Sequence, residues 1–287
     1  MIRYFLCATI LYLTTCCVNG QTSGREHLYD TPEDKDIFAR YIAAMETKRE
    51  LPVADLFVET GLFFLETPYV AATLEKEPEG LVVNLREMDC TTFVENVYAL
   101  VRTLKMQGTP SYEAFCDHLQ QLRYREGTIT DYTDRLHYTT DWIFENERKG
   151  LLRDVTKEIG GEPLPLALSF MSTHPDSYRQ LKGNPERIKI MAEKEEEISR
   201  RSYYYIAENN IADLTTGMQQ GDMVGFVTTI GGLDLSHVGI IYRTGERVTF
   251  LHASSSAKKV IVQDEELAAY VKRIKTNKGV MIIRFQM

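Results

Sequence analysis

Residues 89–104 read DCTTFVENVYALVRTL, and their apolar side chains recur at the spacing of a helix. The apolar positions are Phe93, Val94, Val97, Leu100, Val101 and Leu104. Because these positions fall on one broad face at about 3.6 residues per turn, we predict a long buried helix. Asp89 stands where a helix N-cap is expected, which places Cys90 in the first turn.

The last third of the chain has the pattern of short strands. Segments rich in β-branched and aromatic residues are separated there by Gly, Asp and Ser. These segments are residues 223–229, 237–242, 248–253, 260–262 and 279–285. Helices first and strands later predict an α+β fold, in which the helix that carries Cys90 packs on an antiparallel sheet.

The segments before Cys90 and directly after its helix are predicted to be helical as well. Residues 33–65 have apolar side chains at helical spacing, with breaks expected at Pro52 and Gly61, and so predict two short helices. Residues 112–122 repeat the same period. Cys116 falls on the apolar face of that repeat, so we expect it to be a buried core thiol.

Residues 1–20 have the features of a secretory signal peptide. A single basic residue precedes an apolar run that is shorter than the ~20 residues a membrane-spanning helix needs, and small residues stand near the expected cleavage point. We therefore predict export to the periplasm or the outer surface, with residues 21–287 as a single domain. The alternative is lipoprotein processing at Cys16, which would leave a lipid anchor.

The composition narrows the classes of partner. Acidic residues outnumber basic ones by 41 to 33, for a formal net charge of −8, so nucleic acid is not an expected partner. Of the five cysteines, only Cys90 and Cys116 lie beyond residue 20, and the sequence leaves open whether they pair. We expect no metal or other cofactor, because no His-x-x-x-His pair or cysteine cluster has ligand spacing.

Cys90 is the candidate nucleophile. A thiol attacks as its thiolate, and a helix N-terminus is expected to lower the thiol pKa because its free N–H groups favour an anion. On these cues alone the alternative stays open that Asp89 merely caps the helix and that Cys90 is an ordinary small buried residue.

A nucleophilic thiol needs an imidazole to accept its proton, and that imidazole needs a third polar group to orient it. Of six histidines, His237 lies at a predicted strand start and His252 lies in the next predicted strand. Adjacent antiparallel strands bring such side chains within reach of each other. His137 and His174 lie in predicted loops, and their roles stay open. Cys90, His237 and His252 therefore predict a thiol hydrolase.

The order of these motifs resembles the NlpC/P60 cell-wall hydrolases, which have a papain-like core. The matching segments are Asp89-Cys90, GDMVGF at 221–226, SHVGI at 236–240, HASS at 252–255 and the Thr-Pro-Tyr element at 67–69. The resemblance implies Cys90 as nucleophile, His237 as base, His252 as the orienting group and Tyr69 beside the cysteine.

A closer resemblance is to the DUF1460 branch, over about residues 33–285. It is carried by residues 89–95, 135–142 and 233–239, and it includes a helical and loop insertion from Tyr124 to Tyr203. Within that insertion, residues 186–203 predict a charged helix with a solvated face. The branch implies an N-acetylmuramoyl-L-alanine amidase that acts on soluble muropeptides, including 1,6-anhydro forms.

Two departures from the NlpC/P60 peptidase pattern bear on specificity. Residues 70–73 read VAAT where the peptidases have Trp-Gly-Gly, and Thr91 replaces their serine. Both changes argue against γ-D-glutamyl-diaminopimelate endopeptidase activity, which remains the nearest competing function. The sequence is also compatible with a non-catalytic wall-binding protein and with an acyltransferase.

Five residues are candidates for oxyanion or substrate contacts. They are Tyr69, Asp89, Arg135, Tyr138 and Trp142. An aromatic plane and a guanidinium could stack on a sugar ring and bind a carboxylate. For Arg135 and Trp142 the alternative is a structural ion pair and a core anchor.

Overall fold

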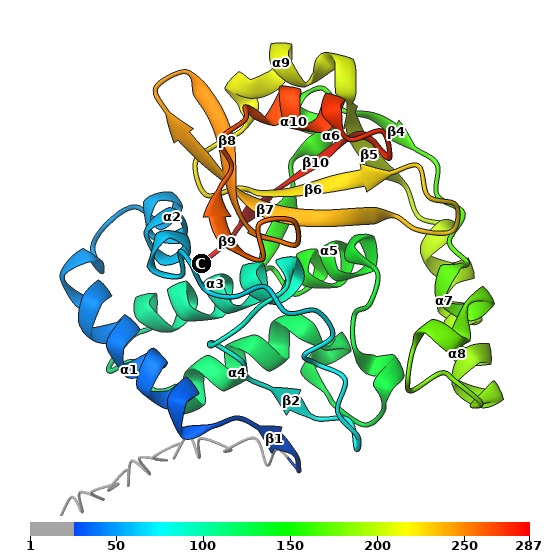
Figure 1. Ribbon diagram of the computed structural model, residues 1–287, viewed down its shortest axis with the longest axis horizontal. Helices are drawn as coiled ribbons and strands as arrows, with labels where there is room; N and C mark the ends of the chain where they lie inside the picture. Colours follow the sequence, from blue (N-terminus) through cyan, green and yellow to red (C-terminus); the bar gives the residue numbers. More distant parts are fainter. Residues whose placement is uncertain (1–25) are drawn as a thin grey trace, which may run out of the picture.

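An antiparallel sheet of eight strands separates the helices of the protein into layers, as the computed structural model shows for residues 26–287 (Figure 1). The predicted signal peptide at residues 1–20, with Cys16, lies outside the described residues. The strands are β3 (Leu152–Asp154), β4 (Glu162–Leu164), β5 (Tyr203–Ala207), β6 (Met223–Thr228), β7 (Leu235–Thr244), β8 (Arg247–Ser254), β9 (Lys259–Val262) and β10 (Asn277–Phe285). Their order is β4-β5-β10-β6-β7-β8-β9, and β3 pairs with β10.

Most of the helices lie on one face of this sheet (Figure 1). That layer contains α1 (Pro32–Met45), α2 (Val53–Phe63), α3 (Cys90–Lys105), α4 (Tyr112–Arg123) and α5 (Thr139–Arg148), with a small parallel pair formed by β1 (Leu28–Tyr29) and β2 (Leu81–Val82). The opposite face carries α6 (Thr156–Ile159), α9 (Ile211–Leu214) and α10 (Leu267–Arg273). At one end of the sheet lie α7 (Phe170–Thr173) and α8 (Pro185–Ser199).

Alternating side chains bury both faces of the sheet. Along β10, Met281 and Ile283 join the core beneath α2 and α3, whereas Val280 and Ile282 join the core on the other face. Successive strand residues point to opposite sides of a sheet, so one apolar strand serves both layers. The histidine-bearing strands β7 and β8 are held between these two cores.

Local sequence explains why α3 begins at Cys90. Asp89 is extended (φ −92°, ψ −177°), and its side chain accepts a hydrogen bond from the Thr92 backbone N–H at 2.8 Å. The Asp89 N–H donates in return to the Thr92 hydroxyl at 2.9 Å, which completes a capping box. The helix packs on β7 and β8, so the predicted placement of the cysteine helix on the antiparallel sheet is confirmed.

The predicted α+β class and all five predicted strands are confirmed, with differences at their ends. Strands β3, β4 and β5 were not predicted, and the charged helix ends at Ser199 because Tyr203 already begins β5. Gly61 does not break a helix. It lies inside α2, where a Cβ would come within 3.0 Å of the Leu251 side chain, so glycine permits close packing on β8.

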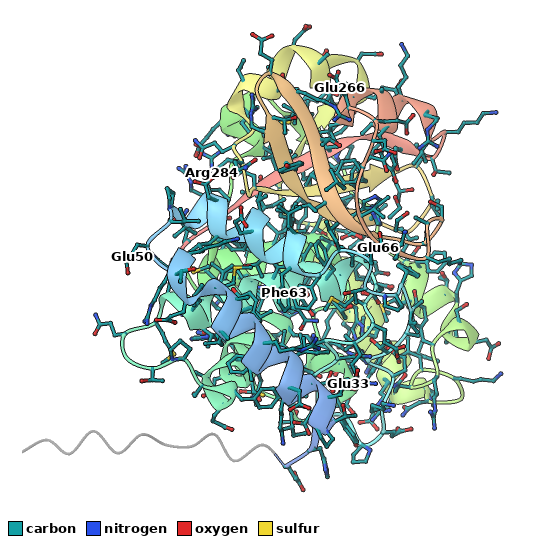
Figure 2. The ribbon with its side chains drawn as sticks, turned by 60° about the vertical axis from the view of Figure 1, so that its left-hand side comes forward. Glu33, Glu50, Phe63, Glu66, Glu266 and Arg284 are labelled. Atoms are coloured by element: carbon teal, nitrogen blue, oxygen red, sulfur yellow. The ribbon has the colours of Figure 1, made fainter. Side chains whose placement is uncertain are left out.

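Figure 2 shows α1 and α2 lying over the helical layer, with Glu33 near one end of α1 and Phe63 at the end of α2. Arg284 and Glu266 lie in the sheet half of the same view. Cys116 is fully buried in α4, as predicted, and Cys90 and Cys116 are not joined by a disulfide. Within residues 26–287, no helix has the length and apolar character needed to cross a membrane.

Candidate active site

Cys90 lies half-buried at the first position of α3, between two chain segments that come from elsewhere in the sequence. On one side, the Tyr69 backbone N–H donates to Lys258 at 2.9 Å and the Val70 N–H donates to Met88 at 3.1 Å. On the other side, the backbone of Val238 in β7 is hydrogen-bonded to the Cys90 sulfur. The thiol is therefore fixed by β7, by the segment around Tyr69 and by its own helix.

His237 and His252 form a hydrogen-bonded pair across β7 and β8. Nε2 of His237 lies 2.6 Å from Nδ1 of His252, and the two rings are nearly perpendicular, at 82°. Gly239 makes room for this arrangement: a Cβ there would lie 2.8 Å from the Leu251 carbonyl oxygen, 2.9 Å from the Phe250 ring and 3.4 Å from the His252 Cβ. The glycine of the Ser-His-Val-Gly motif is thus required by the close approach of β8.

Aromatic side chains surround the histidine pair. Phe226 packs on His237 with ring centroids 5.5 Å apart, and Phe250 packs on His252 at 4.7 Å. Burial, reinforced by the neighbouring His252, lowers the pKa of His237 to about 3. Burial also lowers the pKa of His252 to about 4. Both imidazoles are therefore neutral near pH 7, and a neutral imidazole can accept a proton.

Gln263 extends the pair by one more polar group. Its Nε2 donates to Glu265 at 3.2 Å, and its side chain opposes the lowering of the His252 pKa. Nε2 of His252 is buried without a hydrogen-bond partner among residues 26–287. A proton on Nε2 of His252 makes Nδ1 of that ring the acceptor. His237 must then carry its proton on Nε2, so its Nδ1 is the nitrogen left to serve as a base.

The Cys90 thiol departs from the sequence expectation of a lowered pKa. Burial and the neighbouring Asp89 carboxylate raise its pKa to about 12. Hydrogen bonds from the Val238 backbone and from Thr91 lower the pKa by less than burial raises it. The helix N-terminus lowers the Cys90 pKa by less than desolvation raises it. Before substrate binds, Cys90 is therefore a thiol and His237 a neutral imidazole.

A cavity of about 180 Å³ brings the predicted catalytic side chains to one place. It is lined by Cys90, Thr91, His137, Tyr138, Thr139, Met171, Tyr178, Leu233, Asp234, Leu235, Ser236, His237 and Val238. Asp234 fixes one wall: its carboxylate accepts from the Thr140 N–H at 2.7 Å, from the Thr140 hydroxyl at 2.9 Å and from the Leu235 N–H at 2.7 Å. These bonds join the start of α5 to the start of β7.

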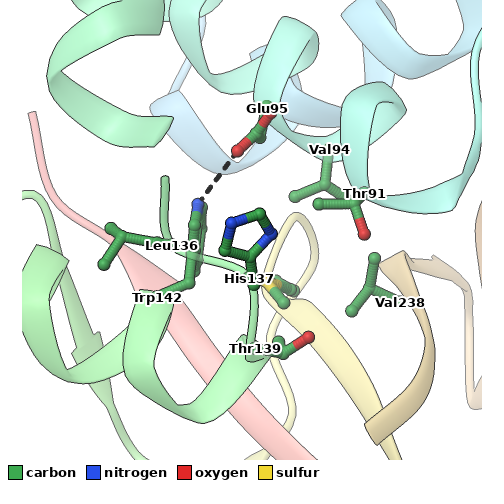
Figure 3. Close-up of a pocket in the computed structure, with 9 residues that line it drawn as sticks. Thr91, Val94, Glu95, Leu136, His137, Thr139, Trp142 and Val238 are labelled. Atoms are coloured by element: carbon green, nitrogen blue, oxygen red, sulfur yellow. Dashed lines mark hydrogen bonds between the residues drawn. The ribbon is translucent and has the colours of Figure 1, made fainter. Parts of the chain in front are cut away.

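A second, smaller cavity of about 20 Å³ shares part of that wall (Figure 3). It is lined by Thr91, Val94, Glu95, Leu136, His137, Thr139, Trp142, Met223 and Val238. The Trp142 indole N–H donates to Glu95 at 3.2 Å, and Glu95 is also paired with the fully buried Arg123 at 2.7 Å. Burial raises the pKa of Glu95, and Arg123 opposes that rise.

The five predicted contact residues have different surroundings. Tyr69 lies beside Cys90, where burial and then the cysteine and Asp89 raise its pKa. Tyr138 lines the larger cavity and donates to Glu195 at 2.6 Å, and Trp142 lines the smaller one. Asp89 caps α3 as described above.

Arg135 lies outside both cavities. Its guanidinium is paired with Glu75 at 3.1 Å and with Glu79 at 3.2 Å, and its side chain is only 5% exposed. Tyr132 covers it at 4.9 Å. These contacts favour the structural ion pair that the sequence left open as the alternative to substrate binding.

Sequence reasoning missed three residues of this site. His137, left without a role, lies in the walls of both cavities, Asp234 anchors a wall, and Gln263 supports His252. For His137 the available signal was its place between the site candidates Arg135 and Tyr138. Within residues 26–287, no group of three or more His, Cys, Asp or Glu side chains is arranged to hold a metal ion.

Comparisons with known proteins cover most of the chain. A family model described as AmiA-like, N-acetylmuramoyl-L-alanine amidase-like, matches residues 59–280. A crystal structure of an N-acetylmuramoyl-L-alanine amidase from Bacteroides uniformis is 38% identical, with a TM-score of 0.78, over 82% of this chain and 99% of that chain. No curated protein sequence matches the chain.

Two further solved structures are similar. A putative xylanase from Bacteroides fragilis is 38% identical, with a TM-score of 0.76, over 79% of this chain and 100% of that chain. A DUF1460 protein from Legionella pneumophila is 22% identical, with a TM-score of 0.66, over 89% of this chain and 95% of that chain. The last likeness is one of fold.

Proposed function

The chain belongs to the AmiA-like, N-acetylmuramoyl-L-alanine amidase-like family, and from this we propose that it hydrolyses the amide bond between N-acetylmuramic acid and L-alanine in peptidoglycan fragments. The observation that supports this proposal is that Cys90 and His237 line the same cavity, and that Nε2 of His237 is hydrogen-bonded to Nδ1 of His252 at 2.6 Å. This arrangement supports a thiol mechanism, and we propose that the enzyme is a cysteine hydrolase of the papain-like, NlpC/P60 type.

In the first half of the reaction, the thiol proton passes to Nδ1 of His237 while the Cys90 sulfur attacks the lactyl carbonyl carbon. The carbonyl oxygen becomes an oxyanion, held by the Cys90 backbone N–H and the Tyr69 hydroxyl. A preorganised donor of this kind stabilises the transition state by roughly 3 kcal/mol. His237 then protonates the alanine nitrogen, the C–N bond breaks, and an acyl thioester remains on Cys90.

In the second half, a water molecule replaces the departed peptide. His237 removes a proton from this water, which attacks the thioester carbon. The C–S bond breaks, and the proton on His237 returns to the sulfur, which yields the free muramic acid carboxyl group and restores the thiol. His252 keeps the same tautomer of His237 throughout both halves.

The raised thiol pKa fits this cycle. A thiol with a pKa of about 12 is not a free thiolate near pH 7, so its proton must move as the sulfur attacks. Burial lowers the pKa of His237 to about 3, so its imidazole is unprotonated near pH 7. The bond from the Val238 backbone then stabilises the anionic sulfur.

One wall of the larger cavity comes from the insertion between Tyr124 and Tyr203, which supports specificity for a muramoyl group. Five lining residues come from the insertion between Tyr124 and Tyr203, namely His137, Tyr138, Thr139, Met171 and Tyr178. We propose that this wall binds the sugar. Sugar contacts remote from the reacting carbon would position the lactyl carbonyl, so a stem peptide without its sugar should not be cleaved. The 1,6-anhydro muropeptides are the proposed substrates.

Incubation with 1,6-anhydro-disaccharide-tetrapeptide and with the free tetrapeptide tests the proposal. We expect mass spectrometry to find the disaccharide and the intact tetrapeptide in the first mixture, and unchanged peptide in the second. Cys90→Ala protein is the control. Release of L-Ala-D-Glu from the free peptide would identify a γ-D-glutamyl endopeptidase instead.

A wall-binding protein and an acyltransferase would each give a different result. Binding of the muropeptide without any cleavage would indicate a wall-binding protein. An acyltransferase would release less free sugar acid when an added amine competes with water for the thioester, and the amide of that amine would appear.

Glycoside hydrolysis is not favoured by the cavity. It generally requires two carboxyl groups that flank the scissile bond. Asp234 is the carboxylate in the larger cavity, and its oxygens are occupied by Thr140 and Leu235. Glu95, in the smaller cavity, is occupied by Arg123 and Trp142.

A substrate released from peptidoglycan is consistent with action outside the cytoplasm, where the cell wall lies. We propose that residues 1–20 direct export to the periplasm or the outer surface. Mass analysis of the exported protein would distinguish cleavage before Gln21 from a lipid-modified Cys16.

A further inference from the structure

His137 contributes to the walls of two neighbouring cavities. It lines both the larger cavity, which contains Cys90, and the small cavity, where Figure 3 shows its ring between Trp142 and Val238. The proposed reaction does not use this ring. A polar group in such a position requires an explanation, because the small cavity is otherwise lined largely by apolar side chains.

The hydrogen-bonding state of His137 follows from its neighbours. Its Nε2 lies 2.9 Å from the backbone oxygen of Tyr132. A carbonyl oxygen only accepts, so Nε2 must carry the proton. Burial, and then the nearby Arg135, lower the pKa of His137 to about 3, so the ring stays neutral. Nδ1 is consequently the acceptor nitrogen of a ring that lines both cavities.

The small cavity has the size and the lining for one methyl group. A volume of about 20 Å³ is close to the minimum that admits a water molecule. A water molecule needs two to four polar partners, whereas much of this lining is apolar: Val94, Leu136, Trp142, Met223 and Val238. A ligand that matches both features carries an N–H group and, a few bonds away, a methyl group.

We infer that Nδ1 of His137 accepts a hydrogen bond from the acetamido N–H of N-acetylmuramic acid, and that the small cavity receives the acetamido methyl group. This inference rests on the proposed function and identifies the sugar substituent that the site recognises. The acetamido group lies on the ring carbon next to the one that bears the lactyl ether. It can therefore reach a wall adjoining Cys90 while the lactyl carbonyl lies at the sulfur.

The scissile amide cannot supply this N–H. Its nitrogen must receive a proton from His237 as the C–N bond breaks, so a fixed hydrogen bond to His137 on the other wall would oppose the reaction. The next peptide N–H, between alanine and D-glutamate, is the competing donor. A substrate altered only at the sugar distinguishes the two.

The test compares two synthetic 1,6-anhydromuramoyl-L-Ala-D-Glu substrates that differ in one atom group. One has the natural 2-acetamido substituent, and the other has a 2-acetoxy substituent, in which oxygen replaces N–H and the methyl group is kept. We expect wild-type protein to prefer the acetamido substrate by at least about tenfold in kcat/KM. The acetoxy oxygen has no hydrogen to donate, so Nδ1 of His137 loses its hydrogen bond and faces another acceptor atom. In His137→Phe, which keeps an aromatic ring but removes the acceptor, the ratio should fall towards one.

His137→Gln supplies another acceptor and should restore part of the preference. His174→Phe is the matched control, because His174 is exposed, lies outside both cavities and should leave the ratio unchanged. Circular dichroism and thermal melting check that each variant is folded. If His137→Phe does not fold, the wild-type ratio and His137→Gln still decide the outcome.

Each contrary outcome has a distinct meaning. Equal cleavage of both substrates by wild-type protein would overturn this inference and leave the amidase proposal intact. An undiminished preference in folded His137→Phe would also overturn it, and would point to the peptide N–H or another acceptor. No cleavage of the acetamido substrate by wild-type protein would overturn the amidase proposal and this inference with it.

Discussion

Nε2 of His237 is hydrogen-bonded to Nδ1 of His252 at 2.6 Å, so the two imidazoles act as a unit in which only one nitrogen of His237 remains available. That nitrogen, Nδ1, is the one that can exchange a proton with Cys90. The nearby Gln263 opposes the lowering of the His252 pKa. The role of His252 is therefore one of positioning, and it differs from the proton-transferring role of His237.

His252→Asn should retain measurable activity, because an Asn side chain can still accept from Nε2 of His237. His252→Leu, of similar size, should lose kcat by about 10²-fold or more with little change in KM, since orientation acts on the chemical step. Steady-state kinetics of both variants, with His237→Ala as the reference for complete loss, provide the measurement. Full activity in His237→Ala would contradict the mechanism.

Cys90→Ala should abolish turnover, with a loss on the order of 10⁴-fold or more, while the fold is retained because the side chain is small and half-buried. Cys116→Ala, in the core of α4, should remain active and lose about 1 kcal/mol of stability. Rates and urea unfolding curves of the two variants give the comparison. Inactivation by Cys116→Ala instead would show that the nucleophile is assigned wrongly.

Gly239→Ala should damage catalysis from a position that touches no substrate. The added methyl group would meet the Leu251 carbonyl oxygen, the Phe250 ring and the His252 Cβ, so β8 and His252 must shift. We expect kcat to fall by about tenfold or more, since small displacements of catalytic groups are costly. Gly231→Ala is the matched control, because no atom lies within 4 Å of a Cβ at that position. Equal activity of the two variants would contradict the proposed role of the glycine.

The pH dependence of stability follows from the buried histidines. In the folded protein the pKa of His237 is about 3 and that of His252 about 4, whereas both are near 6.5 in an unfolded chain. Between these values the unfolded chain binds more protons, so this contribution is complete above pH 6.5 and is lost as the pH falls towards 3.

Thermal melting from pH 7 to pH 4 measures this effect. Because carboxylates also titrate in that range, the readout is the difference between wild type and His237→Phe/His252→Phe, whose melting temperature should fall less on acidification. A matching fall in both proteins would contradict the lowered histidine pKa values.

Arg135→Met should reduce stability rather than substrate affinity. Removal of the guanidinium leaves the buried Glu79 carboxylate, 4% exposed, without its ion-pair partner and with only the Tyr124 hydroxyl as a hydrogen-bond donor, which costs about 3–5 kcal/mol. Arg153→Met, which breaks a pair of exposed side chains with Glu158, should cost only about 0–1 kcal/mol. Urea unfolding and KM are both measured. A raised KM at unchanged stability would restore Arg135 as a substrate-binding residue.

The local pattern of residues determined much of the fold. Asp89 and Thr92 are three residues apart, so their capping box and the start of α3 are settled within one turn. Strands β6 to β10 follow from local runs rich in β-branched and aromatic residues. Strands β3 and β4 have three residues each, and β4 contains Pro163, so they carry too little local signal, and their pairing depends on distant partners.

The catalytic residue types were also visible in the sequence, since a cysteine at a helix start and two histidines in neighbouring strands are local features. The family match confirms the predicted relation to N-acetylmuramoyl-L-alanine amidases, while the NlpC/P60 assignment and the roles of Cys90, His237 and His252 stay predictions.

Only the tertiary structure decided the environment of each side chain. Burial by β7 and the nearby Asp89 raise the Cys90 pKa that the helix start alone was expected to lower. Glu75 and Glu79, more than fifty residues upstream, occupy Arg135. The physical reason is the same in both cases: helix starts and strand alternation depend on residues a few positions apart, whereas desolvation and ion pairing depend on whichever distant segments pack against the side chain.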